Sequence, residues 1–376
     1  MFFDLLFTFI FAISALYILS KVAIKFGLVD EPNLRKHHEG NIPLVGGLAI
    51  FSSLLFYLIY NPSMLPNSEL FLVSIGILVI LGAIDDRFDL PITPRLLMQV
   101  GITMLVISQT NLQLDYIGNI TGFGSMNLGA GASFVTILAV IGAINAFNMV
   151  DGIDGLLGGL AIITFTSMAI ILNFHALDNL AFVCIVIVTA LSPYVMMNLG
   201  AFGIKRKIFM GDAGSMMIGF IVIWFLLIMT QPNANATMRP VTALWLIALP
   251  LMDMTAIMFR RLIRGQSPLK PDRDHLHHTC LNAGISPSGT LFVICGVASI
   301  FAGIGILGEL FEIAESIMFY GFLCCFGVYA YGLNKNWPKH LYQIVLGNLD
   351  DNIISFPTTN DSHKNKYSSK SIKKYK

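Results

Sequence analysis

Long apolar stretches, separated by short polar segments, follow one another along almost the whole chain. A helix that crosses a bilayer needs roughly 17 to 25 mostly apolar residues, because hydrocarbon offers no other partner to the backbone. The pattern predicts eleven such helices, at about residues 2–20, 44–60, 69–84, 96–109, 133–147, 156–174, 180–197, 216–230, 241–259, 290–310 and 316–332. We therefore expect an all-α, polytopic integral membrane protein.

Composition supports this class. Hydrophobic residues make up 55% of the 376 residues and charged residues 12%, whereas a soluble domain has about 25% charged residues. One membrane domain is expected over residues 1–349, and the polar, lysine-rich tail 350–376 is expected to be disordered. The five cysteines show no CxxC spacing, which predicts neither a disulfide framework nor a thiolate zinc site.

The positive charges are distributed unequally between the two faces. If the connections between the apolar segments alternate in side, 22 of the 23 lysines and arginines fall on one face and only Arg239 on the other. Lysine and arginine mark the cytoplasmic side of a membrane protein. This distribution predicts a periplasmic N-terminus and a cytoplasmic C-terminus, with the lipid bilayer as partner. It contains no basic footprint for nucleic acid beyond a solvated tail.

The dense polar clusters all fall on the predicted cytoplasmic face. They occupy residues 30–47, 85–89, 145–159, 205–215 and 270–284. The loops on the other face, such as NPSMLPNSE, hold no comparable cluster. One site assembled from five loops is the simplest interpretation.

Asp85 and Asp86 end one of the apolar segments. Two adjacent carboxylates repel each other unless a cation or a proton relieves them, and negative charge at a helix C-terminus also opposes the helix dipole. A cation is therefore expected nearby. The alternative is a solvated helix end with Arg87 as the partner.

Three further aspartates stand where helices are expected to begin. Asp151 and Asp154 precede one helix, and Asp212 precedes another. Each could simply cap its helix. The glycines around them favour close approach of a ligand, and helix N-termini favour phosphate binding. Carboxylates beside phosphates suit Mg²⁺, which binds through one or two carboxylates and substrate phosphates.

Basic and aromatic residues complete the candidate site. Two basic clusters suit a phosphate or pyrophosphate: Arg35, Lys36 and His38 in one, and Arg273, His275, His277 and His278 in the other. The first cluster could instead be a membrane anchor, and the histidines could instead bind zinc, although no thiolate accompanies them. Phe209 offers a face for a nucleobase or dips into the membrane interface.

Five motifs in order, between about residues 28 and 285, resemble a known family: RKHHEGNIPLVGG, DDRFDL, NAFNMVDGIDGL, IFMGDAGS and DRDHLHH. They resemble the polyprenyl-phosphate N-acetylhexosamine-1-phosphate transferases, most closely the bacterial branch that starts O-antigen and enterobacterial common antigen assembly, a part of lipopolysaccharide biosynthesis. The resemblance implies UDP-N-acetylglucosamine and undecaprenyl phosphate as substrates, UMP as a product, and Mg²⁺ or Mn²⁺ as cofactor. It also implies a bacterial inner membrane protein with a cytoplasmic active site.

The resemblance assigns roles to individual residues. Asp212 matches the principal metal ligand, and Asp85 and Asp86 match the paired catalytic acids. Asn148, Asp151 and Asp154 match a stretch implicated in nucleotide binding. Phe209 matches an aromatic residue that stacks on uracil. His275, His277 and His278 match a motif near the sugar and pyrophosphate.

Several alternatives stay open. Within the family, a phospho-N-acetylmuramoyl-pentapeptide transferase is disfavoured by IPLVGG and DRDHLHH, whereas teichoic-acid N-acetylglucosamine-1-phosphate transferases are harder to separate. A cation-coupled transporter would place acids near the midplane, often in repeated halves. Asp253, inside an apolar segment, fits transport or a buried partner for the site. The oligomeric state cannot be read from the sequence, which leaves a homodimer open.

Overall fold

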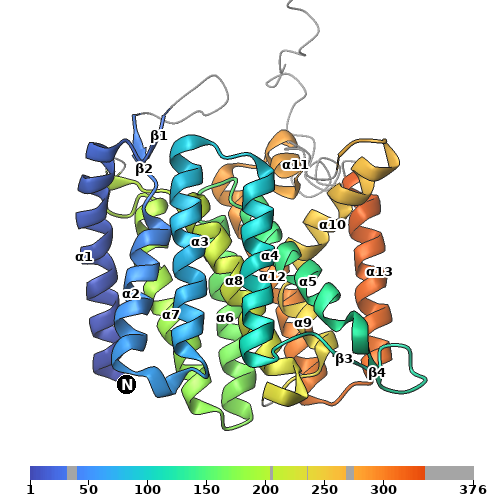
Figure 1. Cartoon of the computed structure of the whole chain (residues 1–376). Helices are drawn as coiled ribbons and strands as arrows, with labels where there is room; N and C mark the ends of the chain where they lie inside the picture. The colour runs from blue at the N-terminus through green and yellow to red at the C-terminus, as the bar shows by residue number, and fades with distance from the viewer. Residues whose placement is uncertain (32–39, 204–205, 235, 268–274, 335–376) are drawn as a thin grey trace, which may run out of the picture.

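The computed structural model describes residues 1–31, 40–203, 206–234, 236–267 and 275–334. They form a bundle of long, roughly parallel helices (Figure 1). The helices are α1 Phe2–Phe26, α2 Gly46–Tyr60, α3 Ser68–Phe88, α4 Ile92–Thr110, α5 Ala132–Met149, α6 Leu156–Phe174, α7 Asp178–Asn198, α8 Gly211–Thr230, α9 Pro240–Leu246, α10 Ala248–Ile263, α11 Leu276–Asn282, α12 Pro287–Leu310 and α13 Glu315–Asn334.

Short strands and 3-10 turns lie at the two ends of the bundle. At one end β1 (Val29–Asp30) pairs antiparallel with β2 (Ile42–Pro43), and at the other β3 (Tyr116–Gly118) pairs antiparallel with β4 (Met126–Asn127). The 3-10 turns are η1 Pro62–Met64, η2 Gly129–Gly131 and η4 Pro232–Ala234. We call the end with β1, β2 and α11 the site end, and the end with β3 and β4 the far end (Figure 1).

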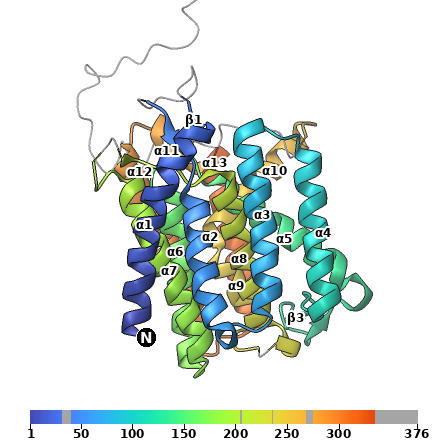
Figure 2. The same ribbon diagram turned by 60° about the vertical axis from the view of Figure 1, so that its left-hand side comes forward.

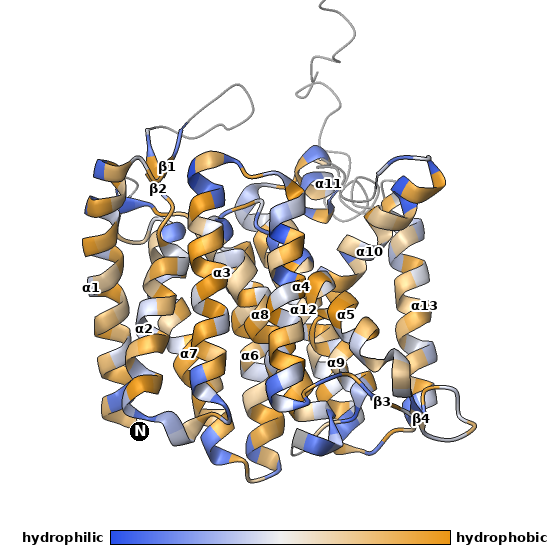
Figure 3. Ribbon diagram, in the orientation of Figure 1, coloured by the Kyte–Doolittle hydropathy of each residue, from blue (hydrophilic) through white to orange (hydrophobic). Residues whose placement is uncertain are grey.

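The apolar segments expected from the sequence are helices, which confirms the all-α, polytopic class. Eight helices of the described chain are long and apolar enough to cross a membrane, and α9 with α10, bent by 84° at their junction, would make a ninth span. Apolar residues follow the helices along their length, and polar residues gather at both ends (Figure 3). Helices α2 and α4 occupy two further predicted segments.

Helix α8 forms the centre of the bundle. Its apolar stretch is entirely buried, because α2, α3, α5 and α6 all contact it (Figure 2). Glycines allow this close approach, as is common between membrane helices. A Cβ atom on Gly82 of α3 would collide with the backbone of Asp212 and Ala213, and one on Gly47 of α2 would collide with Gly214. This packing fixes the first turn of α8 at the site end.

Candidate functional site

A cavity of about 330 Å³ opens at the site end. Its walls come from α4, from the end of α5 and the loop after it, and from the histidine segment at α11. The lining residues are Ile92, Arg95, Leu96, Gln99, Asn145, Asn148, Met149, Asp151, Gly152, His275, His277 and His278. Two of the predicted polar clusters, 145–159 and 270–284, therefore meet around one cavity.

Asp86 holds the beginning of α8. Its Oδ1 accepts a hydrogen bond from the Asp212 amide at 2.8 Å, and its Oδ2 accepts one from the Ala213 amide at 3.2 Å. Gly211 has a φ of 74°, and a Cβ atom there would collide with the Asp86 carboxylate. Two amides at this helix N-terminus thus bind a protein carboxylate in place of the expected phosphate.

The other expected ligand-facing glycines also contact protein. A Cβ atom on Gly152 would collide with His277, and one on Gly158 with Val195. These glycines allow helices and loops to pack closely, which the sequence pattern does not distinguish from close approach of a ligand.

Asp85 is paired with Arg95 of α4. The Arg95 Nη1 lies 2.6 Å from Asp85 Oδ2, and the Leu90 amide donates to Asp85 Oδ1 at 2.8 Å. The cation expected beside the aspartate pair is therefore Arg95, whereas Arg87 lies beside Gly27 at the end of α1. Arg95 was not among the predicted site residues, because only the crossing of α3 and α4 brings it to Asp85.

Asp212 lies between Arg95 and Asn148. The Asn148 Nδ2 donates to Asp212 Oδ1 at 2.6 Å and to the Ser215 hydroxyl at 2.8 Å. The Arg95 Nη1 lies 3.8 Å from Asp212 Oδ2. The Asp212 side chain is 34% exposed, so this carboxylate is held by its neighbours and still accessible. Asp85, Asp86 and Asp212 do not line the cavity directly, but they contact Arg95 and Asn148, which do.

The loop after α5 is tied to the loop before α8. The buried Asn198 accepts a hydrogen bond from the Gly155 amide at 2.5 Å and donates to the Ile208 carbonyl at 2.8 Å. Asp154 pairs with Lys207 at 2.6 Å. Neither Asp151 nor Asp154 caps α6, since its N-cap is Gly155 and no side chain caps it. The capping alternative is therefore wrong for this pair, and Asn198 is a positioning residue that the sequence did not reveal.

The surroundings of Asp151 are electronegative. Desolvation by the crowded loop, and then the charges of Asp212, Asp86 and Asp154, raise the pKa of Asp151 to about 7. Asp151 lines the cavity and stays exposed to solvent. Carboxylates crowded in this way favour binding of a cation.

Phe209 is fixed through its backbone. Its amide donates to the Pro43 carbonyl at 2.9 Å, and its carbonyl accepts from the Gly46 amide at 3.0 Å. The Lys207 Nζ lies 5.3 Å from the centre of the Phe209 ring, within the range of a cation–π interaction. Phe209 is partly exposed and stands beside the Asp154–Lys207 pair, outside the wall of the cavity.

The three histidines lie together at the start of α11. The rings of His275 and His277 are stacked at 5.8 Å, and those of His277 and His278 are 4.2 Å apart. Burial, and then the neighbouring His278 and His275, lower the pKa of His277 to about 3, so this ring is neutral at physiological pH. His275 hydrogen-bonds to Asp253 at 2.8 Å.

The remaining predicted site residues lie outside the described part of the chain. These are Arg35, Lys36, His38 and Arg273. The tail 350–376 lies outside it as well.

Among the described residues, no group of three or more His, Cys, Asp and Glu side chains is arranged to hold a metal ion. Mg²⁺ does not require such a group, because it takes one or two carboxylates from the protein and the rest of its ligands from phosphate and water. The accessible Asp212, with Asp85, Asp86 and Asp151 nearby, provides oxygen ligands of that kind.

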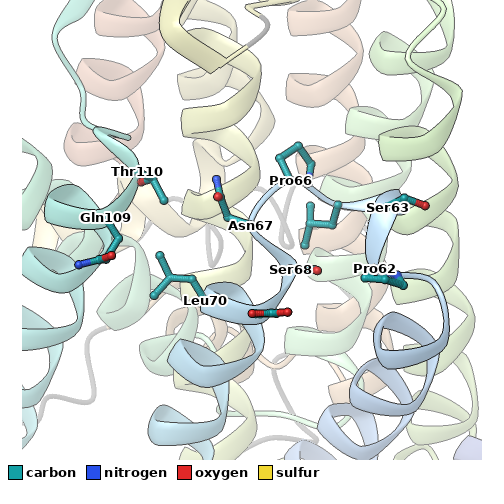
Figure 4. Close-up of a pocket in the computed structure, with 10 residues that line it drawn as sticks. Pro62, Ser63, Pro66, Asn67, Ser68, Leu70, Gln109 and Thr110 are labelled. Carbon is teal, nitrogen blue, oxygen red and sulfur yellow. The ribbon is translucent and has the colours of Figure 1, made fainter.

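A larger hollow, of about 510 Å³, lies at the far end (Figure 4). It is formed by the connection from α2 to α3 and the end of α4, with Pro66, Asn67 and Thr110 in its wall. Glu69 is the only ionisable residue of its lining. A single carboxylate provides no partner of complementary charge, so this hollow is a weaker candidate site than the cavity at the site end.

Comparison with known proteins gives consistent matches. Residues 68–230 match the family described as glycosyl transferase family 4. The undecaprenyl-phosphate alpha-N-acetylglucosaminyl 1-phosphate transferase of Salmonella typhi is 45% identical over 335 residues, 89% of this chain and 91% of that protein. Proteins of the same name are 46% identical in Yersinia pestis, over 89% of this chain and 92% of the relative, and 47% identical in Pasteurella multocida (strain Pm70), over 89% and 94%.

Proposed function

Because the chain belongs to glycosyl transferase family 4, with the undecaprenyl-phosphate transferases as relatives, we propose that it transfers N-acetylglucosamine 1-phosphate from UDP-N-acetylglucosamine to undecaprenyl phosphate. The products are undecaprenyl-pyrophosphoryl-N-acetylglucosamine and UMP. One structural observation supports this assignment independently of the relatives' names. Asp212, held by Asn148 and close to Arg95, joins the aspartate pair of α3 to a cavity at the end of a membrane-spanning bundle.

The reaction is a phosphoryl transfer. An oxygen of the lipid phosphate attacks the β-phosphorus of the nucleotide sugar, and a new phosphorus–oxygen bond forms. The bond between the β-phosphorus and the bridging oxygen breaks, and UMP leaves with that oxygen and the electron pair. Positioning and charge stabilisation provide most of the catalysis in such reactions.

The contacts of Asp85 and Asp86 favour different roles. Both oxygens of Asp86 accept amides of α8, so Asp86 positions Asp212. Asp85 holds Arg95, whose guanidinium lies in the cavity wall and suits a phosphate oxygen. The histidines line the same cavity and provide further polar contacts for the pyrophosphate or the sugar. Phe209 stands where a base could stack beside Lys207.

We propose Mg²⁺, with Mn²⁺ as a substitute, as the cofactor, and Asp212 as its principal protein ligand. The accessible Asp212 carboxylate and the electronegative surroundings of Asp151 support this assignment. When bound, such an ion neutralises charge on the phosphates. Arg95 and Asn148, which line the cavity, hold the Asp212 carboxylate in place.

The proposed topology has eleven spans, with α9 and α10 as one broken span and α2 and α4 included. It places the N-terminus in the periplasm and the site end in the cytoplasm, at the inner membrane of a bacterium. Two observations support it. Arg95 and Lys207 lie at the site end, and Arg239, the one positive residue predicted outside, begins α9 near β3 at the far end.

The test is UMP release by purified protein in detergent, with UDP-N-acetylglucosamine, undecaprenyl phosphate and Mg²⁺. Release that requires the lipid and stops with EDTA is the expected result. If only UDP-N-acetylgalactosamine or UDP-N-acetylmuramoyl-pentapeptide supports release, the reaction class stands and the donor is wrong. If no donor works in folded protein, the proposed function is wrong.

A further inference from the structure

Asp253 is a buried carboxylate in the middle of a broken membrane span. It lies on α10, six residues after the 84° break, and is 2% exposed. A buried carboxylate costs free energy unless hydrogen bonds or charges satisfy it. The hydrogen-bond partners of Asp253 therefore indicate its role.

Three donors from two other elements converge on Asp253. Its Oδ2 lies 2.8 Å from His275 Nδ1. Its Oδ1 accepts the Leu276 amide at 3.0 Å and the Tyr329 hydroxyl at 2.7 Å. Asp253 thus joins α10, the start of α11 and α13 at one point, and these contacts favour the buried partner over the transport interpretation.

Helix α13 supports this junction from behind. A separate hydrophobic cluster packs α13 against the broken span, and within it the Trp245 indole donates to the Met318 carbonyl at 3.2 Å. The Trp245 ring also meets Phe322 edge-on at 5.8 Å. The position of Tyr329, and through it that of Asp253, is therefore set by α13.

The contact with Asp253 determines the protonation pattern of His275. An ionised carboxylate only accepts hydrogen bonds, so Nδ1 of His275 must donate, and Nε2 is the nitrogen left for other partners. His275 lines the cavity. Its neighbour His277 is neutral, because burial lowers its pKa to about 3. Among the contacts of the three histidines, the one between Asp253 and His275 therefore has a defined donor, His275 Nδ1, and a defined acceptor, the Asp253 carboxylate.

We infer that Asp253, held by Tyr329, is a positioning residue that fixes the ring and the tautomer of His275 at the wall of the cavity. The inference rests on the proposed function for its kinetic consequence: the Nε2 of His275 then meets the donor pyrophosphate or the sugar. Mutation of a partner that orients a functional histidine in this way typically lowers affinity or activity by about 10- to 100-fold.

The first test is the tautomer itself, and it needs no substrate. Protein labelled with ¹⁵N-histidine is compared by solid-state NMR with Asp253→Asn, and the His275 signals are assigned from their loss in His275→Gln. In Asp253→Asn, the remaining oxygen must serve Leu276 and Tyr329, so the new amide group faces Nδ1. The His275 tautomer should therefore change from Nδ1–H to Nε2–H. An unchanged tautomer, or an Nε2–H tautomer in the wild type, overturns the inference.

The second test is a double-mutant cycle on kcat/KM. Asp253→Asn should lose about 10- to 100-fold, and combining it with His275→Gln should lose no more than His275→Gln alone, because the two residues act as a unit. Tyr329→Phe, a milder change, should lose about five-fold. Losses that multiply in the double variant would overturn the inference.

Glu309→Gln is the matched control for folding. Glu309 is another carboxylate with little exposure, 9% of its side chain, and it accepts hydrogen bonds from Arg239 and Thr242 at the far end. It should lower thermal stability without changing the His275 tautomer. If the wild type releases no UMP from any donor while the tautomer still depends on Asp253, the proposed function fails and the positioning contact stands.

Discussion

The two ends of the bundle both contain buried acidic residues, but they balance charge differently. At the far end, Glu309 pairs with Arg239, whose guanidinium also donates to the Ile313 and Gly308 carbonyls. At the site end, Asp85 and Asp212 both approach Arg95, and Asp151 has a raised pKa because of further carboxylates. The far end is a satisfied structural contact. Around Asp212, the described carboxylates Asp85, Asp86 and Asp151 outnumber the guanidinium of Arg95, and a bound cation would relieve this local repulsion.

The contrast also appears in exposure. The Glu309 side chain is 9% exposed and that of Asp212 is 34% exposed. A carboxylate that only stabilises the fold can be closed off from solvent, whereas one that binds a ligand must be reached from outside. Removing charge should therefore affect activity at the site end and stability at the far end.

The largest effect is expected for Asp212→Asn. This change keeps the shape of the side chain and its place near Asn148, but it removes the charge that we assign to the metal. Lipid-dependent UMP release should fall by about a thousandfold, in line with the loss of one main electrostatic contribution. The thermal unfolding temperature in the absence of Mg²⁺ should not fall. An active Asp212→Asn protein would contradict the contrast between a ligand-binding carboxylate at the site end and a structural carboxylate at the far end.

Arg95→Gln should have the next largest effect. It removes the cation from Asp85 and Asp212 and takes a guanidinium from the cavity wall. We expect kcat/KM to fall about 100-fold, with additional destabilisation because Asp85 stays buried without its partner. Arg95→Lys serves as the comparison, since it keeps the charge but not the planar fork. Equal activity of the two variants and the wild type would contradict a role in binding phosphate.

Glu309→Gln tests the far end. Loss of a buried, charge-assisted contact should cost about 2 kcal/mol of folding stability, measured by thermal or denaturant unfolding in detergent. At a temperature where the variant is folded, its kcat/KM should stay within about two-fold of the wild type. A large loss of kcat/KM in folded protein would show that the two ends are not separate in function.

The smallest effect concerns Asp151 and pH. The folded protein holds the Asp151 proton up to about pH 7, whereas an unfolded chain releases it near pH 4. Stability therefore falls as pH rises from about 4 to 7, because the folded state binds more protons than the unfolded state.

Asp151→Asn removes this dependence. Without divalent cations at pH 8, it should raise Tm by about 1 to 3 °C, a modest gain because Asp151 is exposed to solvent. The gain should shrink at pH 5 and also when Mg²⁺ is added to both proteins. A gain that does not depend on pH would assign the effect to something other than the carboxylate charge.

Most of the fold could be predicted from the pattern of apolar residues. The segment expected at 156–174 is α6, with the same bounds, and the segment expected at 241–259 lies within α9 and α10. The break between α9 and α10 was not predicted, because both halves are apolar and hydropathy alone does not separate them. Pro250 was the available signal: it has no N–H to donate to the Leu246 carbonyl four residues earlier, and its ring clashes with that carbonyl. Both halves also pack against α12 and α13.

The sequence predicted which residues form the candidate site, but it predicted their roles only in part. Asp85, Asp86, Asn148 and Asp212 do meet, as five loops on one face suggested. The hydrogen-bond partners of each residue could not be assigned, because the sequence does not distinguish two adjacent aspartates such as Asp85 and Asp86. Asp86 binds amides of α8 while Asp85 binds Arg95, a difference that depends on which way each side chain leaves the end of α3.

The sequence by itself predicted that this protein lies in a membrane, which of its segments form apolar helices and which of its loops contain the candidate site residues. Hydrophobicity and charge act locally along the chain, so they can be read without knowing the fold. Only the tertiary structure decided that Arg95 neutralises Asp85, that Asn198 ties two loops together and that Asp253 and Tyr329 hold His275. Each of these contacts joins helices far apart in the chain, and its geometry depends on how closely the helices pack.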